Sequence, residues 1–190
     1  EEKNNLPSFK NVILKISEVY SDQREKILNQ SSLIKKHLEL QKNAVINQSF
    51  QPFLDDILNG LDPVNGGYKG APKFPIFNIN DTLLYFYRKN KEKKFLSPVA
   101  LIIKKLCSKG IYDHVEGGIA RYTVDESWLI PHFEKMLYDN AQFVSLVSKY
   151  LTVNPSKYFE KKLIKTIHFM KNNFHESKFG LLGSAYDADS

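Results

Sequence analysis

Hydrophobic residues recur every three or four positions along most of the chain, which is the pattern of amphipathic helices. No alternating stretch of useful length predicts a strand, although residues 117–124 could form a short hairpin arm. The pattern therefore predicts an all-α protein. Seven helices are expected: after Pro7, from Ser21-Asp22, over about 49–60, from Asn80 as a cap, from Pro98 after a Ser97 cap, from Pro131 to about Leu151, and from Asn154-Pro155.

Three long connections contain glycine, at 65–75, 110–128 and 179–190, and two helices separate each from the next. The other connections, near 90–97 and 152–155, are short and polar. In a row of antiparallel helices every second connection lies at the same end. We therefore expect the three glycine-containing loops to share one face of an α/α toroid or solenoid, and to carry its function.

The predicted helix from Pro131 changes character along its length. Its second half is apolar nearly all round, which is typical of a helix buried on several sides. In its first turns, His132, Lys135 and Asp139 would share one helix face, and Glu134 and Tyr138 another. An inner helix with a polar end at the loop face suits the floor or rim of a central pocket.

Composition narrows the class of protein. In 190 residues, 42 % apolar and 13 % aromatic side chains suffice for a folded core. The net charge of +6 is spread along the chain in Lys-Lys pairs, a solvated surface rather than a nucleic-acid-binding stripe. No segment predicts a membrane span or a signal peptide. The single Cys107 lies in an apolar run, so we expect a buried thiol, no disulfide and a cytoplasmic protein.

Residues 111–128 gather the chemistry of a sugar-binding cleft. Carboxylates and arginine bind hydroxyl groups in pairs, and aromatic rings pack on the C–H face of a sugar. Asp113, Arg121 and Trp128, with Tyr138 beyond them, supply these groups. The alternative is that Arg121 pairs with Asp125 or Glu126 and only holds the loop.

His132 follows Pro131 at the expected helix start, where the helix dipole would favour a neutral imidazole suited to act as a general base. A structural histidine bonded to a loop carbonyl is the alternative. Asp187 and Asp189 place two carboxylates on the third loop, as glycoside cleavage would require.

Lys73 and Lys135 could anchor an acidic group, or Lys135 could pair with Asp139. Loop-fixing ion pairs are an equal alternative. The spacing of histidines and carboxylates matches no zinc motif, and we expect neither metal nor cofactor.

The stretches "GGYKGAPKFP", "GGIARYTVDESWLIPHFEKMLYDNAQ" and "SAYDADS" resemble the thioredoxin-domain-containing proteins of the spermatogenesis-associated type, over about residues 50–190. The resemblance implies a thioredoxin-like domain followed by an (α/α)6 barrel of the six-hairpin glycosidase type. That barrel is similar to those of N-acylglucosamine 2-epimerases and cellobiose 2-epimerases.

Residues 1–48 would then be a helical connector after a thioredoxin-like domain, and 49–190 the N-terminal part, about half, of a toroid truncated at its C-terminal end. We expect the chain to be a fragment that is inactive alone and that self-associates through its exposed edge. The full-length protein would handle a small sugar as an epimerase, isomerase or glycoside hydrolase. In such epimerases paired histidines transfer protons, so a second histidine would have to come from the other half.

The alternatives are a non-catalytic binding or scaffold toroid that acts with the thioredoxin-like domain, and a purely structural domain. The residues predicted for catalysis are His132, Asp113 and Asp187. The residues predicted to bind substrate are His114, Arg121, Tyr122, Trp128, Lys135, Tyr138, Asp139 and Asp189.

Overall fold

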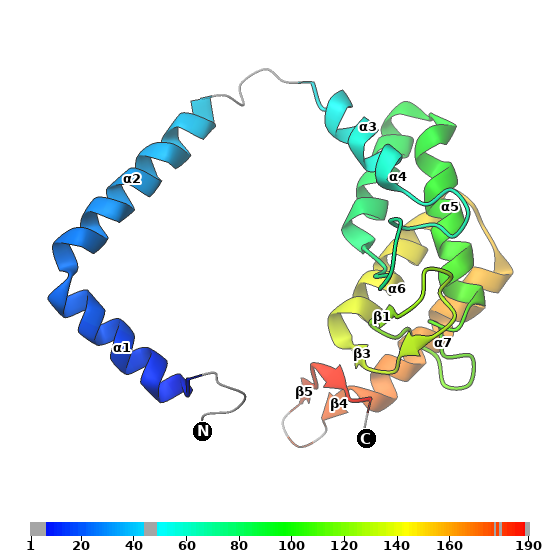
Figure 1. Ribbon diagram of the computed structural model, residues 1–190. Helices are drawn as coiled ribbons and strands as arrows, with labels where there is room; N and C mark the ends of the chain where they lie inside the picture. Colours follow the sequence, from blue (N-terminus) through cyan, green and yellow to red (C-terminus); the bar gives the residue numbers. More distant parts are fainter. Residues whose placement is uncertain (1–6, 44–48, 177, 179, 189–190) are drawn as a thin grey trace. The chain divides into compact units, whose positions relative to one another are not determined.

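A computed structural model describes residues 7–43, 49–176, 178 and 180–188 (Figure 1). The chain divides into two compact units, Glu1–Gln51 and Pro52–Ser190. Each unit is described by itself below.

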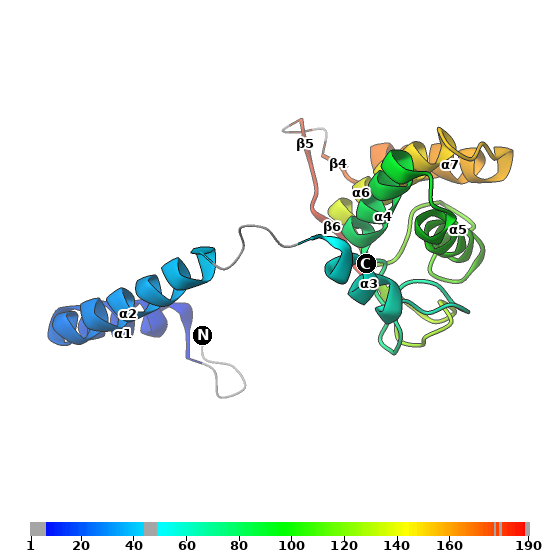
Figure 2. The ribbon, with the colours of Figure 1, turned by 90° about the horizontal axis from the view of Figure 1, so that it is seen from above.

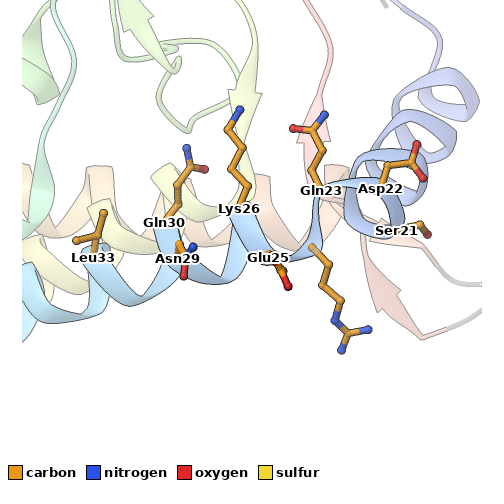
Figure 3. A pocket seen from close by; sticks show the side chains of 9 residues that line it. Ser21, Asp22, Gln23, Glu25, Lys26, Asn29, Gln30 and Leu33 are labelled. Atoms are coloured by element: carbon orange, nitrogen blue, oxygen red, sulfur yellow. The ribbon is translucent and has the colours of Figure 1, made fainter.

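The first unit consists of helices α1 (Phe9–Asp22) and α2 (Arg24–Asn43). The Ser8 hydroxyl accepts a hydrogen bond from the Asn11 N–H and caps α1, which buries none of its residues. A pocket lies at the α1–α2 junction, and Figure 3 shows the side chains that line it. All the residues that line this pocket, from Ser21 to Leu33, are exposed, so it lacks the enclosure of a small-molecule site.

The second unit contains α3 (Gln51–Gly60), α4 (Phe77–Asn90), α5 (Lys93–Ser108), α6 (Leu137–Leu151) and α7 (Lys157–Asn173). Helices α4 and α5 form one hairpin, α6 and α7 form a second, and α4 packs on α6. Figure 2 shows α5 and α7 on the same side of the α4–α6 pair. Two consecutive hairpins whose first helices pack together are the repeat of a helical toroid, which confirms the predicted fold class.

The core lies between these hairpins. Ile103 of α5 and Phe143 and Val147 of α6 are completely buried, and Phe77 of α4 packs edge-on against Phe143 with ring centroids 6.5 Å apart. Apolar burial of this kind fixes the hairpins against each other.

Short strands join the three long loops to one another. Strand β1 (Tyr122–Thr123) pairs with β2 (Pro131–His132), β3 (Lys135–Met136) pairs with β6 (Ala185–Tyr186), and β4 (His175–Glu176) pairs with β5 (Leu181–Leu182), all antiparallel. An isolated bridge links Lys73 of the first loop to Thr123 of the second. The first loop therefore contacts the second, and the second contacts the third, at one end of the hairpins.

The start of α6 differs from the expectation. The helix begins at Leu137 rather than Pro131, because the preceding residues extend to pair with β1 and β6. Such tertiary pairing overrides a helical pattern in the sequence. The predicted helix face of His132, Lys135 and Asp139 is wrong, as is the helix-dipole argument for His132, which lies on β2.

Other helix starts also move. Helix α4 begins at Phe77 rather than after a cap at Asn80, and α5 begins at Lys93, so that Pro98 lies inside the helix. Helix α7 begins at Lys157, where the Ser156 hydroxyl accepts the Phe159 N–H. Helix ends are set by caps and neighbouring loops, which the hydrophobic period does not encode.

Candidate functional site

Two of the three loops carry the same pattern, D-x-V-x-G-G, at 62–67 and 113–118. In the first loop, Asp62 Oδ1 accepts the N–H groups of Val64 and Asn65, both at 2.8 Å. Its Oδ2 accepts Lys73 Nζ at 2.7 Å, and its N–H donates to Gly67 O at 2.7 Å. One carboxylate thus closes the turn and binds a lysine.

The second loop repeats this arrangement. Asp113 Oδ1 accepts the N–H groups of Val115 at 2.8 Å and Glu116 at 2.9 Å, and Oδ2 accepts Lys135 Nζ at 2.7 Å. The Asp113 N–H donates to Gly118 O at 2.9 Å. We call the two arrangements the Asp62 clasp (Asp62 with Lys73) and the Asp113 clasp (Asp113 with Lys135).

Glycine is required in both clasps. Gly66 and Gly67 have φ of 73° and 69°, and Gly117 and Gly118 have φ of 99° and 80°. A side chain at Gly118 would also come within 2.9 Å of Asn140 Oδ1. The repeated D-x-V-x-G-G pattern was the available sequence signal for these clasps, and reasoning from single motifs missed it.

The clasp carboxylates are held ionised. Burial by itself would raise the pKa of Asp62, but hydrogen bonds from Asn65, Lys73 and Val64 lower it far below its usual value. Burial also acts to raise the pKa of Asp113, and the hydrogen bonds from Lys135 and its own loop again outweigh it. A carboxylate bound in this way is poorly suited to exchange a proton with a substrate.

The lysine of each clasp packs over an aromatic ring in the interior of the protein. Lys73 Nζ lies 5.4 Å from the centre of the Trp128 ring, and Lys135 Nζ lies 4.1 Å from that of Phe169. Trp128 is completely buried, and its indole N–H donates to Asn65 O at 2.9 Å. Trp128 and Lys135, both predicted to bind substrate, are thus placed in the interior.

Asp139, in the first turn of α6, has a different environment. The residue is 8 % exposed, and its Oδ2 is the one buried side-chain polar atom of the described residues that lacks a hydrogen-bond partner. Burial raises the pKa of Asp139 to about 6, although the nearby charge of Arg121 acts in the opposite direction. The carboxyl group is therefore half-protonated at about pH 6 and mostly ionised at neutral pH.

Three side chains surround Asp139. Arg121 Nη1 contacts Glu134 Oε2 at 3.0 Å, and Arg121 remains 42 % exposed. Tyr138 interacts with both Arg121 and Asp139, and it is 47 % exposed. We call these four residues, Arg121, Glu134, Tyr138 and Asp139, the Asp139 corner. Arg121 pairs with Glu134, not with Asp125 or Glu126 as the alternative held.

Buried Asn140 fixes the geometry of this corner. Its Oδ1 accepts the Ile119 N–H at 2.8 Å, and its Nδ2 donates to Ile119 O at 3.1 Å and to Met136 O at 2.9 Å. The Arg121 N–H donates to Glu134 O at 2.8 Å. The Arg121 segment is therefore held against the start of α6. Glu134 and Asn140 were absent from the predicted site.

An aromatic row is formed by Phe74 of the first loop, Tyr122 of the second loop and His132 of β2. The Phe74 and Tyr122 rings stack with centroids 4.8 Å apart, and the Tyr122 and His132 rings stack at 4.9 Å. Lys73 and Thr123, which form the bridge under this row, are buried. Because side chains alternate across a strand, Phe74 and Tyr122 point away from the core. Phe74 and His132, the two ends of this row, are both exposed.

Three further predicted residues are His114, Asp187 and Asp189. His114 contacts Lys109 O at the end of α5 through Nε2 at 3.1 Å, and Lys162 Nζ of α7 through Nδ1 at 2.9 Å. Asp187 is exposed and follows β6. Asp189 lies outside the described residues.

Two classes of site find no support among the described residues. These residues contain no group of three His, Cys, Asp or Glu side chains that could hold a metal ion. Likewise, no helix in the described part of the chain is long and apolar enough to cross a membrane.

The two hairpins and the loops that join them belong to a helical toroid, a fold that resembles the one found in sugar epimerases. The structure is similar to cellobiose 2-epimerase from Spirochaeta thermophila, with a TM-score of 0.60 and 18 % identity over 75 % of this chain and 42 % of that one. It is also similar to cellobiose 2-epimerase from Bacillus thermoamylovorans, with a TM-score of 0.58 and 16 % identity over 73 % and 42 % of the two chains. At this identity the likeness establishes the fold.

The sequence is related to the spermatogenesis-associated proteins. It is 30 % identical to human spermatogenesis-associated protein 20 and 28 % identical to the rat protein, in each case over 96 % of this chain. The alignments cover 25 % of each relative, so the chain spans about a quarter of their length. The family resemblance predicted from the three sequence stretches is confirmed, although no protein-family model matches the chain.

Proposed function

We propose that the loop end of the toroid binds a sugar and that Asp139 transfers a proton to and from it, in an epimerase or isomerase reaction of the full-length protein. The observation that carries this proposal is the buried, unpartnered Oδ2 of Asp139 beside Arg121. An unpaired buried carboxylate costs folding stability, and such groups cluster at functional sites.

The environment of Asp139 suits a general acid–base. With a pKa of about 6, the carboxylate form is available near neutral pH, and its conjugate acid remains strong enough to return the proton. As a base, Asp139 would take the proton from the carbon next to the carbonyl of an open-chain sugar. The C–H electrons would form an enediolate, and reprotonation would give the epimer or isomer, so the reaction needs no oxidant.

Arg121 is placed to stabilise the charge that develops on the sugar oxygen. Its Nη1 is bonded to Glu134, but a guanidinium carries five N–H donors and the side chain is partly exposed. The aromatic row of Phe74, Tyr122 and His132 would pack on the C–H face of the ring. In this proposal Asp139 takes the role of general base that the sequence suggested for His132.

One observation favours a second candidate. Glu134 already accepts a hydrogen bond from Arg121 and neutralises its charge. An arginine that is paired in this way would stabilise charge on a substrate less well, which is expected for a toroid that binds without catalysis. Such a toroid would act with a thioredoxin-like domain in the full-length protein, the partner predicted from the family resemblance. Self-association stays a prediction of the sequence.

Turnover by the full-length protein tests the proposal. A panel of aldoses and disaccharides is assayed for epimerisation and isomerisation with wild type, Asp139→Asn and the control Asp56→Asn, which changes an exposed aspartate of α3. We expect Asp139→Asn to lower kcat by about 100-fold or more, the usual contribution of a general acid–base, while Asp56→Asn has no effect.

Each other result has a definite meaning. Full turnover in Asp139→Asn overturns the catalytic role of Asp139. Sugar binding without turnover in wild type selects the non-catalytic toroid. Absence of both binding and turnover across the panel rejects the sugar-handling function.

A further inference from the structure

Lys162 of α7 lies in a cluster of side chains that the proposed sugar reaction does not use. Its Nζ lies 2.9 Å from Nδ1 of His114, 4.2 Å from the centre of the Tyr112 ring and 5.7 Å from that of the Tyr158 ring. Lys162 is half-buried, and His114 is exposed. These contacts hold the amine in one position, where it remains partly accessible to solvent.

The two contacts of His114 fix which ring nitrogen carries its hydrogen. Nε2 lies 3.1 Å from Lys109 O, and because a carbonyl oxygen only accepts hydrogen bonds, Nε2 is the donor. In the neutral imidazole Nδ1 is then the acceptor, so Lys162 Nζ donates to it. An imidazole nitrogen in this state can take a proton from the amine that it contacts.

No carboxylate balances the charge of Lys162 within the described part of the chain. Glu160, an acidic residue of the same helix, pairs with Lys157 instead, at 3.2 Å. Burial raises the pKa of the Cys107 thiol of α5 to about 12, so this neighbour is uncharged at neutral pH. Lys165, one turn further along α7, adds a second positive charge. The surroundings therefore favour an uncharged group at position 162.

These surroundings lower the pKa of Lys162. Burial has the largest effect, and the charge of Lys165 acts in the same direction, while the uncharged Cys107 thiol supplies no opposing negative charge. A larger share of the amine is then unprotonated near neutral pH than for a lysine in water. Only the unprotonated amine is a nucleophile, so the cluster activates Lys162.

From this geometry we propose that Lys162 is a site of acylation, modified by a small acyl thioester with His114 as the proton acceptor. The neutral amine donates one N–H to His114 Nδ1 and keeps its lone pair for the carbonyl carbon of the thioester. The N–C bond forms, the C–S bond breaks, and the sulfur leaves as a thiolate with the bonding electrons. His114 takes the proton from the nitrogen and passes it to water or to the thiolate, so the step needs no oxidant or reductant.

The acylated side chain suits its surroundings. The amide keeps one N–H, which can still donate to His114 Nδ1. It carries no charge, so burial costs less than for the ammonium group, and the repulsion from Lys165 ends. The inference does not depend on the proposed sugar reaction, because neither Lys162 nor His114 belongs to the Asp139 corner.

The rate of acetylation at each lysine tests the proposal. The full-length protein is incubated with S-acetyl-N-acetylcysteamine, a small acetyl thioester, and peptide mass spectrometry follows each site with time. Lys161 is the matched control, because it is the neighbouring residue of α7 and is exposed, whereas Lys162 is half-buried. We expect Lys162 to react at least about fivefold faster than Lys161. Accessibility alone predicts the reverse order.

His114→Gln tests the proton acceptor, because glutamine can accept the hydrogen bond from Lys162 but cannot take its proton. We expect the rate at Lys162 to fall by at least about fivefold, while the rate at Lys161 stays unchanged. Glu116→Gln, at an exposed position of the same loop, should change neither rate. Circular dichroism checks that both variants fold.

The outcomes are distinct. A wild-type protein in which Lys162 reacts no faster than Lys161 overturns the acylation site, and this comparison decides even if His114→Gln does not fold. A folded His114→Gln variant in which Lys162 keeps its full rate overturns His114 as the proton acceptor.

Discussion

The buried carboxylates of the two clasps and of the Asp139 corner differ in the hydrogen bonds that they accept and in the direction in which their pKa values shift. Asp62 and Asp113 each receive two backbone N–H groups and a lysine, and their pKa values fall. Asp139 has an oxygen without a partner, and its pKa rises to about 6. The difference teaches that position on the loop face does not make an aspartate functional; the hydrogen bonds that it already accepts decide which role it can take.

The two clasps also differ from each other in depth. The side chains of Lys73 and Asp62 are 1 % and 10 % exposed, whereas those of Lys135 and Asp113 are 10 % and 27 % exposed. An ion pair that is shielded from water loses more when one partner is removed. The Asp62 clasp should therefore contribute most to stability, the Asp113 clasp less, and the Asp139 corner should reduce it.

The largest effect is expected at the deeper clasp. Lys73→Met leaves the Asp62 carboxylate without its counter-charge and should lower the free energy of unfolding by about 3–5 kcal/mol. Urea unfolding followed by circular dichroism measures the change. Lys69→Met, which removes an exposed lysine of the same loop, should change stability by less than about 0.5 kcal/mol. Equal effects of the two substitutions would show that the clasp is not a stabilising element.

Much of the fold was predictable because apolar spacing reports burial. The helical hairpins and the shared loop face followed from periodicity and from the alternation of long and short connections. The start of α6 was not predictable in this way. Residues 131–136 have a helical pattern, yet they pair with 122–123 and 185–186 from other loops. Such pairing depends on chain segments that come together only in the folded protein.

Arg121, Tyr138 and Asp139 were predicted to bind substrate from their chemistry, and the structure brings them together at the start of α6. Their role in binding stays a prediction. Asp113 was named for catalysis because residue type alone does not distinguish a bonded carboxylate from an unbonded one. Comparing 62–67 with 113–118 would have indicated that both aspartates close a loop.

A smaller loss is expected at the second clasp. Asp113→Ala removes the acceptor of two backbone N–H groups and the partner of Lys135, which keeps its contact with Gly117 O at 3.2 Å. Because this pair is more exposed, the loss should be about 2–3 kcal/mol, below that of Lys73→Met. Thermal and urea unfolding check the order. Glu116→Ala, an exposed carboxylate of the same loop, is the control, and a larger loss there would contradict the clasp.

The smallest change in the free energy of unfolding is expected for Asp139→Asn, and it should be an increase rather than a loss. The pKa of Asp139 is about 6 in the folded chain, against 3.8 for an unperturbed aspartate, so the folded state binds the proton more tightly. The protonated Asp139 carboxyl therefore contributes to the stability of the folded state. This contribution is fully present below about pH 4 and is lost as the pH rises through about 6. The neutral amide of Asp139→Asn does not ionise, so the variant keeps this stability at high pH. Its free energy of unfolding should exceed that of wild type by about 1–2 kcal/mol at pH 7.5 and by little at pH 4.5.

Urea unfolding at pH 4.5, 6 and 7.5 measures this difference between wild type and variant. Asp113→Asn is the matched control, because a lowered pKa makes its contribution grow with pH until the carboxyl is fully ionised. A difference for Asp139→Asn that stays constant with pH would place the unpaired carboxylate in water and remove the basis for its proton transfer. A difference that grows between pH 4.5 and 7.5 would mean that the fold loses stability because one buried carboxylate oxygen lacks a hydrogen bond, whereas the carboxylates of both clasps stabilise it.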